Sequence, residues 1–134
     1  MQRPLALLLL GLGLGCAEHI SRADLRDQIA SSSPPDIVDV RSRSEYDASH
    51  VPGAVWIPFY AVLGGSEELP VADDPDEPLV VYCEHGPRAG MARAQLWFMT
   101  DRPIRFLEGH MTAWKEEGLP VEPAEEAEGT AVQE

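Results

Sequence analysis

Residues 79–89 read LVVYCEHGPRA, and this stretch decides the fold more than any other part of the sequence. The apolar run Leu79–Tyr82 is typical of a buried strand. The segment from Pro87 onward is typical of a helix, because proline suits the first helical turn. A strand, a loop and a helix form the repeating unit of a parallel α/β sheet, in which ligands bind at the carboxyl ends of the strands. We therefore expect Cys83, the first residue of the loop, to lie at a ligand-binding edge.

The rest of the chain repeats this alternation of strand and helix. We predict strands at 36–40, 54–57, 79–82 and 104–107, and helices at 22–30, 44–48, 59–63, 87–99 and 110–117. Strands separated by helices pair in parallel through right-handed crossovers. Because 134 residues suffice for one domain, we expect a single α/β domain over 18–121, with a central parallel sheet flanked by helices. Apolar residues on several sides of 87–99 predict burial on both sides of that helix, and Trp56, Trp97 and Trp114 are expected in the core and in lid packing.

The charge of the chain is strongly negative. There are 23 acidic and 10 basic residues, which give a net charge of −13. This charge disfavours binding to nucleic acid or to an anionic membrane surface, and no nucleic-acid partner is expected. Much of the acid lies in the loop 67–77 and in the tail 122–134, and both segments are predicted to be solvated and mobile.

Cys83 is the candidate nucleophile. The amino end of the following helix and the side chain of Arg88 bring N–H donors and positive charge to the sulfur, which favours a reactive thiolate. The adjacent carboxylate of Glu84 opposes this effect, whereas His85 is close enough in sequence to tune it, and His50 and His110 are further candidates. A cysteine at a strand end can also be a small buried apolar residue and nothing more. No metal site is expected, because one cysteine and scattered histidines lack chelate spacing.

The order of several short motifs resembles the rhodanese family of sulfurtransferases. The first motif comprises Asp39-Val40-Arg41, Glu45-Tyr46, His50–Ala54 and Ile57-Pro58; the second is the Cys83 loop; the last comprises Leu107-Glu108-Gly109 and Trp114. Each motif is weak alone, but their order and spacing over about residues 20–120 are specific together. His110 stands where the family often has a second glycine, and Ala89 where a serine is frequent. These departures concern substrate geometry rather than the fold.

The resemblance implies a sulfurtransferase that works through a persulfide. In that family the loop cysteine takes a sulfane sulfur from a donor such as thiosulfate and passes it to a thiophilic acceptor such as cyanide or a thiol. On this chain, Cys83 is then the nucleophile and Arg88 contacts the donor or acceptor anion, in preference to a surface salt bridge. The loop that cradles the persulfide comprises Glu84, His85, Gly86, Pro87, Arg88 and Ala89. We expect small-molecule partners, no cofactor and a monomer.

Arg41 follows a neighbouring strand, so two roles are open to it. It either reaches the pocket of Cys83 or pairs with Asp39 or Glu45, and we favour the pairing slightly.

Two other functions compete with sulfur transfer. Cysteine phosphatases and arsenate reductases on related scaffolds place an arginine six positions after the cysteine, whereas Arg88 follows Cys83 by five. The shorter loop fits one sulfur atom better than a tetrahedral oxyanion. A non-catalytic persulfide carrier or docking module is the other alternative, because the acidic surface would repel the thiosulfate dianion.

The amino end has the pattern of an export signal. Arg3 precedes an apolar run, Leu5–Leu14, that is too short to span a bilayer but suits the core of a secretory signal. The Gly15-Cys16 junction resembles a bacterial lipoprotein signal, although Gly13 stands where such signals favour leucine. We predict a signal peptide at 1–15, a lipid on Cys16, and attachment to the periplasmic side of a bacterial membrane, with the outer membrane favoured. A plain cleaved signal and an uncleaved anchor are the alternatives.

Overall fold

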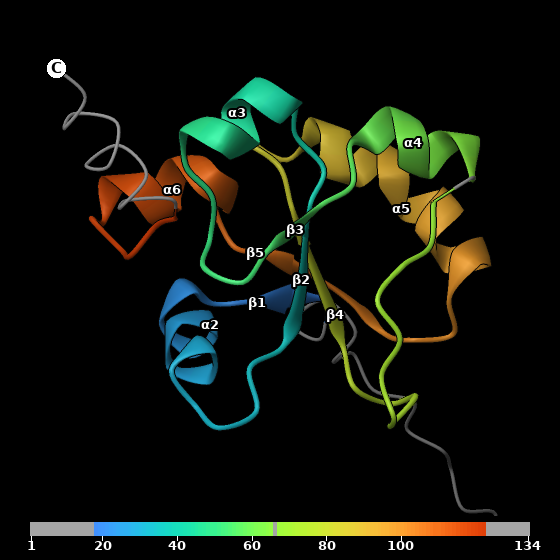
Figure 1. Ribbon diagram of the computed structural model, residues 1–134, viewed down its shortest axis with the longest axis horizontal. Coiled ribbons are helices and arrows are strands. Elements are labelled where there is room, and N and C mark those ends of the chain that lie inside the picture. Colours follow the sequence, from blue (N-terminus) through green and yellow to red (C-terminus); the bar gives the residue numbers. More distant parts are fainter. Residues whose placement is uncertain (1–17, 66, 123–134) are drawn as a thin grey trace, which may run out of the picture.

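A five-stranded parallel sheet forms the centre of the computed structural model, which describes residues 18–65 and 67–122 (Figure 1). The strand order is β1-β5-β4-β2-β3, and all the pairs are parallel. The strands are β1 (His19–Ile20), β2 (Asp36–Asp39), β3 (Val55–Trp56), β4 (Leu79–Tyr82) and β5 (Ile104–Leu107). The helices are α2 (Arg22–Ile29), α3 (Arg43–Ala48), α4 (Phe59–Gly64), α5 (Pro87–Met99) and α6 (His110–Glu116). The predicted single α/β domain is confirmed, and only β1, a strand of two residues, was not predicted.

Helices cover both faces of the sheet (Figure 1). On one face α4 and α5 pack over the strands, with Val62, Ala92 and Leu96 in the core. On the other face α2 and α6 contribute Leu25, Met111 and Trp114. Because side chains alternate along a strand, Val81 and Cys83 of the central segment face the α5 side, and Val80 and Tyr82 face the α6 side. The alternation therefore places the Cys83 sulfur beside the start of α5.

The expectation that the helix at 87–99 is buried on both sides is wrong. In α5 the buried residues are Ala89, Ala92 and Leu96, whereas Trp97 is 80% exposed and Phe98 87% exposed. The reason is that α5 lies in an outer layer, and nothing in the described part of the chain covers its far side. Trp97 is accordingly not a core residue.

The other two tryptophans do take part in packing. Trp114 is buried, as expected, and its indole N–H donates to the carbonyl of Pro120 at 2.8 Å. Trp56 is half-buried, and its indole N–H donates to the carbonyl of Arg41 at 2.9 Å.

The acidic loop is exposed but anchored. Its carboxylates face solvent for the most part, as predicted. Its ends, however, are held by the buried Arg102, which donates to the carbonyls of Pro70, Glu77 and Pro78 and to the carboxylate of Asp36. A guanidinium has enough donors to satisfy several carbonyls at once, so one side chain can fix the course of this segment.

The folded part extends one residue beyond the predicted boundary at 121. The backbone of Glu122 pairs with that of His50 in an antiparallel bridge. The rest of the predicted acidic tail, 123–134, lies outside the described residues, as do the predicted signal at 1–15 and Cys16.

Candidate active site

Cys83 directly follows β4 at the carboxyl edge of the sheet, where the sequence placed it. The residue has no exposed surface, and the backbone N–H of Gly86 donates to its Sγ at 2.9 Å. The loop is also tied to α6, because Met111 N–H donates to the Cys83 carbonyl at 3.0 Å and Thr112 N–H to the Glu84 carbonyl at 3.1 Å. These bonds fix the backbone around the sulfur and aim a donor at it.

Gly86 cannot be replaced without strain. Its φ of +125° is accessible to glycine and rarely to other residues, and an added Cβ would lie 3.2 Å from Nε2 of His110. The conformation of Gly86 turns its N–H toward Sγ. The glycine of this loop is therefore required by the geometry of the sulfur cradle.

His110 holds the loop through a hydrogen bond to its backbone. It has a φ of +53°, and its Nδ1 accepts a hydrogen bond from the backbone N–H of Cys83 at 3.1 Å. The acceptor role requires the neutral ring with its proton on Nε2. Burial and the neighbouring charges of His19 and His85 lower the pKa of His110, which favours that form. Glycine adopts a positive φ most easily, which explains why the rhodanese family, which the sequence resembles, often has a glycine at the position of His110.

We predict that His110 makes stability depend on pH. Its pKa lies below the ordinary value of 6.5 in the folded protein, so the folded state binds fewer protons than the unfolded state as the pH falls below 6.5. The stabilisation is complete above 6.5 and is lost progressively below it. Urea unfolding at about pH 7.5 and about pH 5.5 should show this loss, and His110→Gly should reduce it. An equal loss of stability in wild type and His110→Gly would refute the prediction.

Arg88 forms a salt bridge with a carboxylate. On the sequence alone we favoured a contact with a substrate anion over such a salt bridge. Its guanidinium binds Glu45 through two bonds, Nη1–Oε1 at 2.6 Å and Nη2–Oε2 at 2.9 Å. The hydrogen bonds from Arg88 lower the pKa of Glu45 to about 2, with further help from Ser42. The charge of Arg88 is therefore balanced in this state. Its predicted contact with a donor or acceptor anion stays a prediction.

Glu45 is a site residue whose role sequence reasoning missed. It is the third residue of α3, and Ser42 caps that helix with the reciprocal bonds of a capping box. The cap holds the carboxylate opposite the start of α5. The sequence Ser42-Arg43-Ser44-Glu45 carries the capping-box pattern, and this signal could have identified a fixed carboxylate near the loop.

Arg41 forms the buried pairing that we favoured slightly. The side chain is 2% exposed, and it donates to Asp39 through Nε and Nη2, to Glu84 at 3.0 Å and to the Ser49 carbonyl. The hydroxyl of Tyr82 also donates to Asp39, at 2.7 Å. Burial alone would lower the pKa of Arg41, but hydrogen bonds and charge from Asp39 outweigh it and raise the pKa. Arg41 thus joins strand β2 to the Cys83 loop.

The charge of Glu84 is balanced rather than aimed at the sulfur. Its carboxylate accepts from Arg41, from Thr112 and, at 3.0 Å, from Lys115. Burial alone would raise the pKa of Glu84, but these three bonds outweigh it and lower the pKa. The repulsion of a Cys83 thiolate that the sequence suggested is consequently offset by two cations.

The remaining predicted loop residues have different surroundings. His85 is exposed and contacts the Thr112 hydroxyl through Nδ1 at 3.0 Å. Pro87 is the first residue of α5 and has no N–H to donate, whereas Ala89 is fully buried against the sheet. His50 stacks on Tyr46 with ring centroids 3.7 Å apart and takes no part in the loop contacts described above.

The described residues contain no candidate metal site, and their largest described cavity does not include Cys83. They contain no cluster of three or more histidine, cysteine or carboxylate side chains that could hold a metal ion. A cavity of about 800 Å³ lies between the acidic loop and the end of α5, where it is lined by Leu69, Phe98 and Met99 and not by Cys83. The sulfur itself is fully buried.

A buried cysteine follows the central parallel strand and accepts a glycine N–H at the start of a helix, which defines the class as an α/β domain with a thiol at the carboxyl edge of its sheet. The sequence matches the family model described as Rhodanese-like domain over residues 21–117. The chain therefore belongs to the rhodanese-like domain family, which is a family of sulfurtransferases.

Curated relatives and solved structures agree with this assignment. A sulfurtransferase of Allochromatium vinosum is 27% identical over 103 residues, which cover 77% of this chain and 92% of that protein. A rhodanese-related protein from Thermoplasma volcanium has a TM-score of 0.61 at 26% identity, with 78% of this chain and 96% of that chain covered. A thiosulfate sulfurtransferase from Pseudomonas aeruginosa has a TM-score of 0.62 at 25% identity, with 81% and 20% covered.

Other relatives are longer proteins. An HTH-type transcriptional regulator of Mycobacterium tuberculosis is 34% identical over 112 residues, which cover 81% of this chain and 47% of the regulator. The chain thus spans less than half of that relative.

Proposed function

We propose that the protein moves a sulfane sulfur through a persulfide on Cys83, from a donor such as thiosulfate to a thiophilic acceptor such as cyanide or a thiol. The observation that carries the proposal is the N–H of Gly86, which lies 2.9 Å from the buried sulfur. A donor aimed at sulfur stabilises the negative charge of a thiolate and of a persulfide. Membership of the rhodanese-like domain family supports the same chemistry.

The reaction needs no outside oxidant or reductant. The Cys83 thiolate attacks the outer sulfur of thiosulfate, the S–S bond breaks, and sulfite leaves with the bonding electron pair. Cyanide then attacks the outer sulfur of the persulfide, and the Cys83 thiolate leaves as thiocyanate forms. The anionic donor is bound by Arg88, which exchanges its partner Glu45 for the donor's sulfonate oxygens.

Loop length favours sulfur over phosphate. Arg88 follows Cys83 by five positions, and within that short loop the buried Sγ accepts a hydrogen bond from the N–H of Gly86. A phosphate ester requires space for a tetrahedral group and several N–H donors around it, whereas a persulfide adds one atom. A cysteine phosphatase or arsenate reductase is accordingly the weaker candidate.

Opposite changes on the two sides of the Arg88–Glu45 pair test how the donor is bound. We expect Arg88→Ala to raise KM for thiosulfate roughly tenfold, because a charged hydrogen-bonding partner is lost. We expect Glu45→Gln to lower KM, because it frees the guanidinium and removes a competing anion. Steady-state thiocyanate formation measures both effects. If the pair were only structural, the two variants would change KM in the same direction.

The third candidate is a carrier that never turns over a small donor. Wild-type protein that accepts sulfur from another protein's persulfide but forms no thiocyanate from thiosulfate would favour it. Cys83-dependent hydrolysis of an aryl phosphate, without thiocyanate formation, would instead favour the phosphatase.

We further propose that Cys16 carries a lipid and that the protein lies on the periplasmic side of a bacterial membrane, preferably the outer membrane. The support is the sequence Arg3, Leu5–Leu14 and Gly15-Cys16. Within residues 18–65 and 67–122, no helix has the length and apolarity needed to cross a membrane. Several acyl chains would be needed for firm attachment, because one chain binds only weakly.

Metabolic labelling with a fatty acid tests the lipid. We expect label in the wild-type protein and none in Cys16→Ser, because the thiol is the attachment point. Equal labelling of both proteins, or none in either, would contradict the proposal. An unlabelled protein released in soluble form would point to a plain signal peptide.

A further inference from the structure

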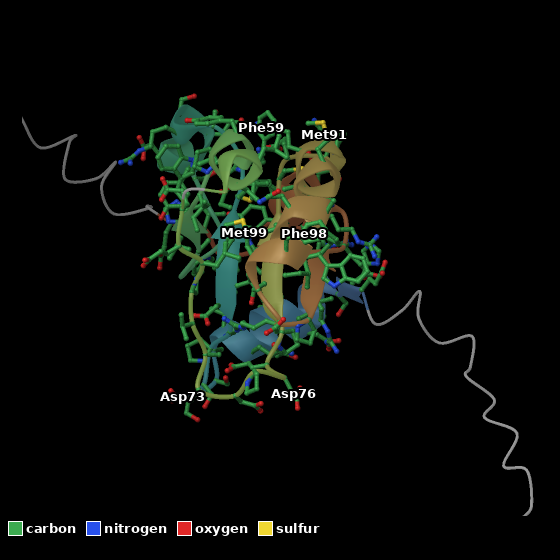
Figure 2. All side chains as sticks on the ribbon, turned by 90° about the vertical axis from the view of Figure 1, so that its right-hand side faces the viewer. Phe59, Asp73, Asp76, Met91, Phe98 and Met99 are labelled. Atoms are coloured by element: carbon green, nitrogen blue, oxygen red, sulfur yellow. The ribbon has the colours of Figure 1, made fainter. Side chains whose placement is uncertain are left out.

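The outer face of α5 is exposed and uncharged along the whole helix. It begins at the active loop and comprises Pro87, Gly90, Met91, Ala94, Trp97 and Phe98. Met91 is 53% exposed, Trp97 80% and Phe98 87%. Figure 2 looks onto this helix, with Met91 near its upper end and Phe98 further along it. We call these six residues the α5 outer face.

This pattern is the reverse of an ordinary surface helix. A helix that covers a sheet normally buries one apolar side and turns charged residues to solvent. Here small and apolar residues face both ways, and the aromatic side chains are on the exposed side. Arg93, which lines a cavity together with Trp97, forms an ion pair with Glu18, so this pair adds no net charge beside Trp97. The α5 outer face is therefore suited to contact with an apolar or interfacial surface.

The start of the described chain lies at the edge of this face. Glu18 lines a cavity of about 380 Å³ together with Arg93 and Trp97. Cys16 precedes Glu18 by two residues, which span at most about 7 Å when fully extended. A membrane anchor on Cys16, or an uncleaved apolar segment before it, therefore places the bilayer surface close to Trp97. No longer linker is available to hold the domain away.

We propose that the α5 outer face rests on the phospholipid bilayer, with Trp97, Phe98 and Met91 in its interfacial layer. Tryptophan and phenylalanine are the residues that interfacial helices place there. The bilayer surface is zwitterionic, because a net charge of −13 would be repelled by anionic lipid. Asp73 and Asp76 of the acidic loop lie at the opposite end of the molecule from Met91 (Figure 2), whereas Glu67, Glu68 and Asp101 line the cavity beside Phe98. The proposal rests on the membrane attachment inferred above and goes beyond sulfur transfer.

Tryptophan fluorescence on vesicles tests this contact. The full-length protein is reconstituted into phosphatidylcholine vesicles with and without brominated phosphatidylcholine, which quenches only tryptophans at the bilayer. We expect clear quenching in the wild type, loss of most of it in Trp97→Phe, and full retention in the matched control Trp56→Phe. Trp114 is buried and contributes no quenching. Equal quenching in Trp97→Phe and wild type would overturn the proposal.

Flotation separates failure of the contact from failure of the attachment. Protein that floats with the vesicles but shows no quenching overturns the bilayer contact and leaves the attachment intact. Protein that does not float overturns both. The sulfurtransferase activity of the same sample reports independently on the proposed chemistry.

The alternative occupant of the α5 outer face is a second copy of this chain. Analytical sedimentation of the protein, which measures its oligomeric state, tests this alternative. A dimer abolished by Phe98→Asp, with no quenching, would show that a second copy covers the face.

Discussion

Replacement of Cys83 by serine is expected to reduce thiocyanate formation from thiosulfate and cyanide to the uncatalysed background while the fold persists. A hydroxyl cannot form a persulfide, so no residual route through this residue exists. The side chains have nearly the same volume, and the serine oxygen can accept the N–H of Gly86 that now points at Sγ. Activity assays and thermal unfolding, made on the same preparation, measure the two halves of this prediction.

A second variant controls for the serine hydroxyl. Cys83→Ala removes the nucleophile without adding a polar atom to a fully buried position. We expect both variants to be inactive and both to unfold cooperatively. Thiocyanate formation by either one at the wild-type rate would show that Cys83 is not the sulfur carrier.

The second large effect concerns stability and comes from the buried ion pair beneath the loop. Asp39→Ala should lower the free energy of unfolding by about 3–5 kcal/mol, because it leaves a buried guanidinium without its carboxylate. Arg41 is 2% exposed and Asp39 fully buried, and the Tyr82 hydroxyl would lose its acceptor as well. Urea unfolding at neutral pH measures the change.

A surface pair provides the matched control. Asp47 binds Arg43 one turn away on α3, with both side chains more than half exposed. Asp47→Ala should therefore cost less than about 1 kcal/mol. The double variant Asp39→Leu/Arg41→Met should recover much of the stability lost by Asp39→Ala, because it removes both buried charges. A loss in Asp39→Ala no larger than that in Asp47→Ala would show that the buried pair does not hold this edge together.

Much of the fold could be predicted because local patterns and tertiary packing agree. The run Leu79–Tyr82 is apolar and short, and it is the central strand with all its residues buried. Pro87 marked the start of α5 correctly. The two-residue strand β1 could not be predicted, because it has no pattern of its own and forms by pairing with β5.

The outside of α5 shows where such reasoning fails. Apolar residues on two sides of a helix predict two buried sides, but only packing decides which of them has a neighbour. In the described part of the chain, Trp97 and Phe98 stay 80% and 87% exposed. The periodicity of apolar residues along the sequence cannot show that these two side chains are exposed.

The site was predictable in its centre and less so in its supports. Cys83 and Gly86 follow from a strand, a turn and a helix start. The partners of Arg88 and Arg41 depend on distances between elements that are 43 residues apart in sequence, as in Arg88–Glu45 and Arg41–Glu84. Among these partners, only Glu45 is marked by a local sequence pattern, the capping box that it forms with Ser42.

The mass of the intact protein after incubation with thiosulfate tests the central claim most directly. If Cys83 carries sulfur, the mass rises by that of one sulfur atom, about 32 Da, and falls back when cyanide is added, as the persulfide chemistry requires. Peptide analysis should place the added atom on Cys83, and Cys83→Ser should gain none. A wild-type protein that turns over thiosulfate without any gain of mass at Cys83, or that gains sulfur elsewhere, would contradict the account.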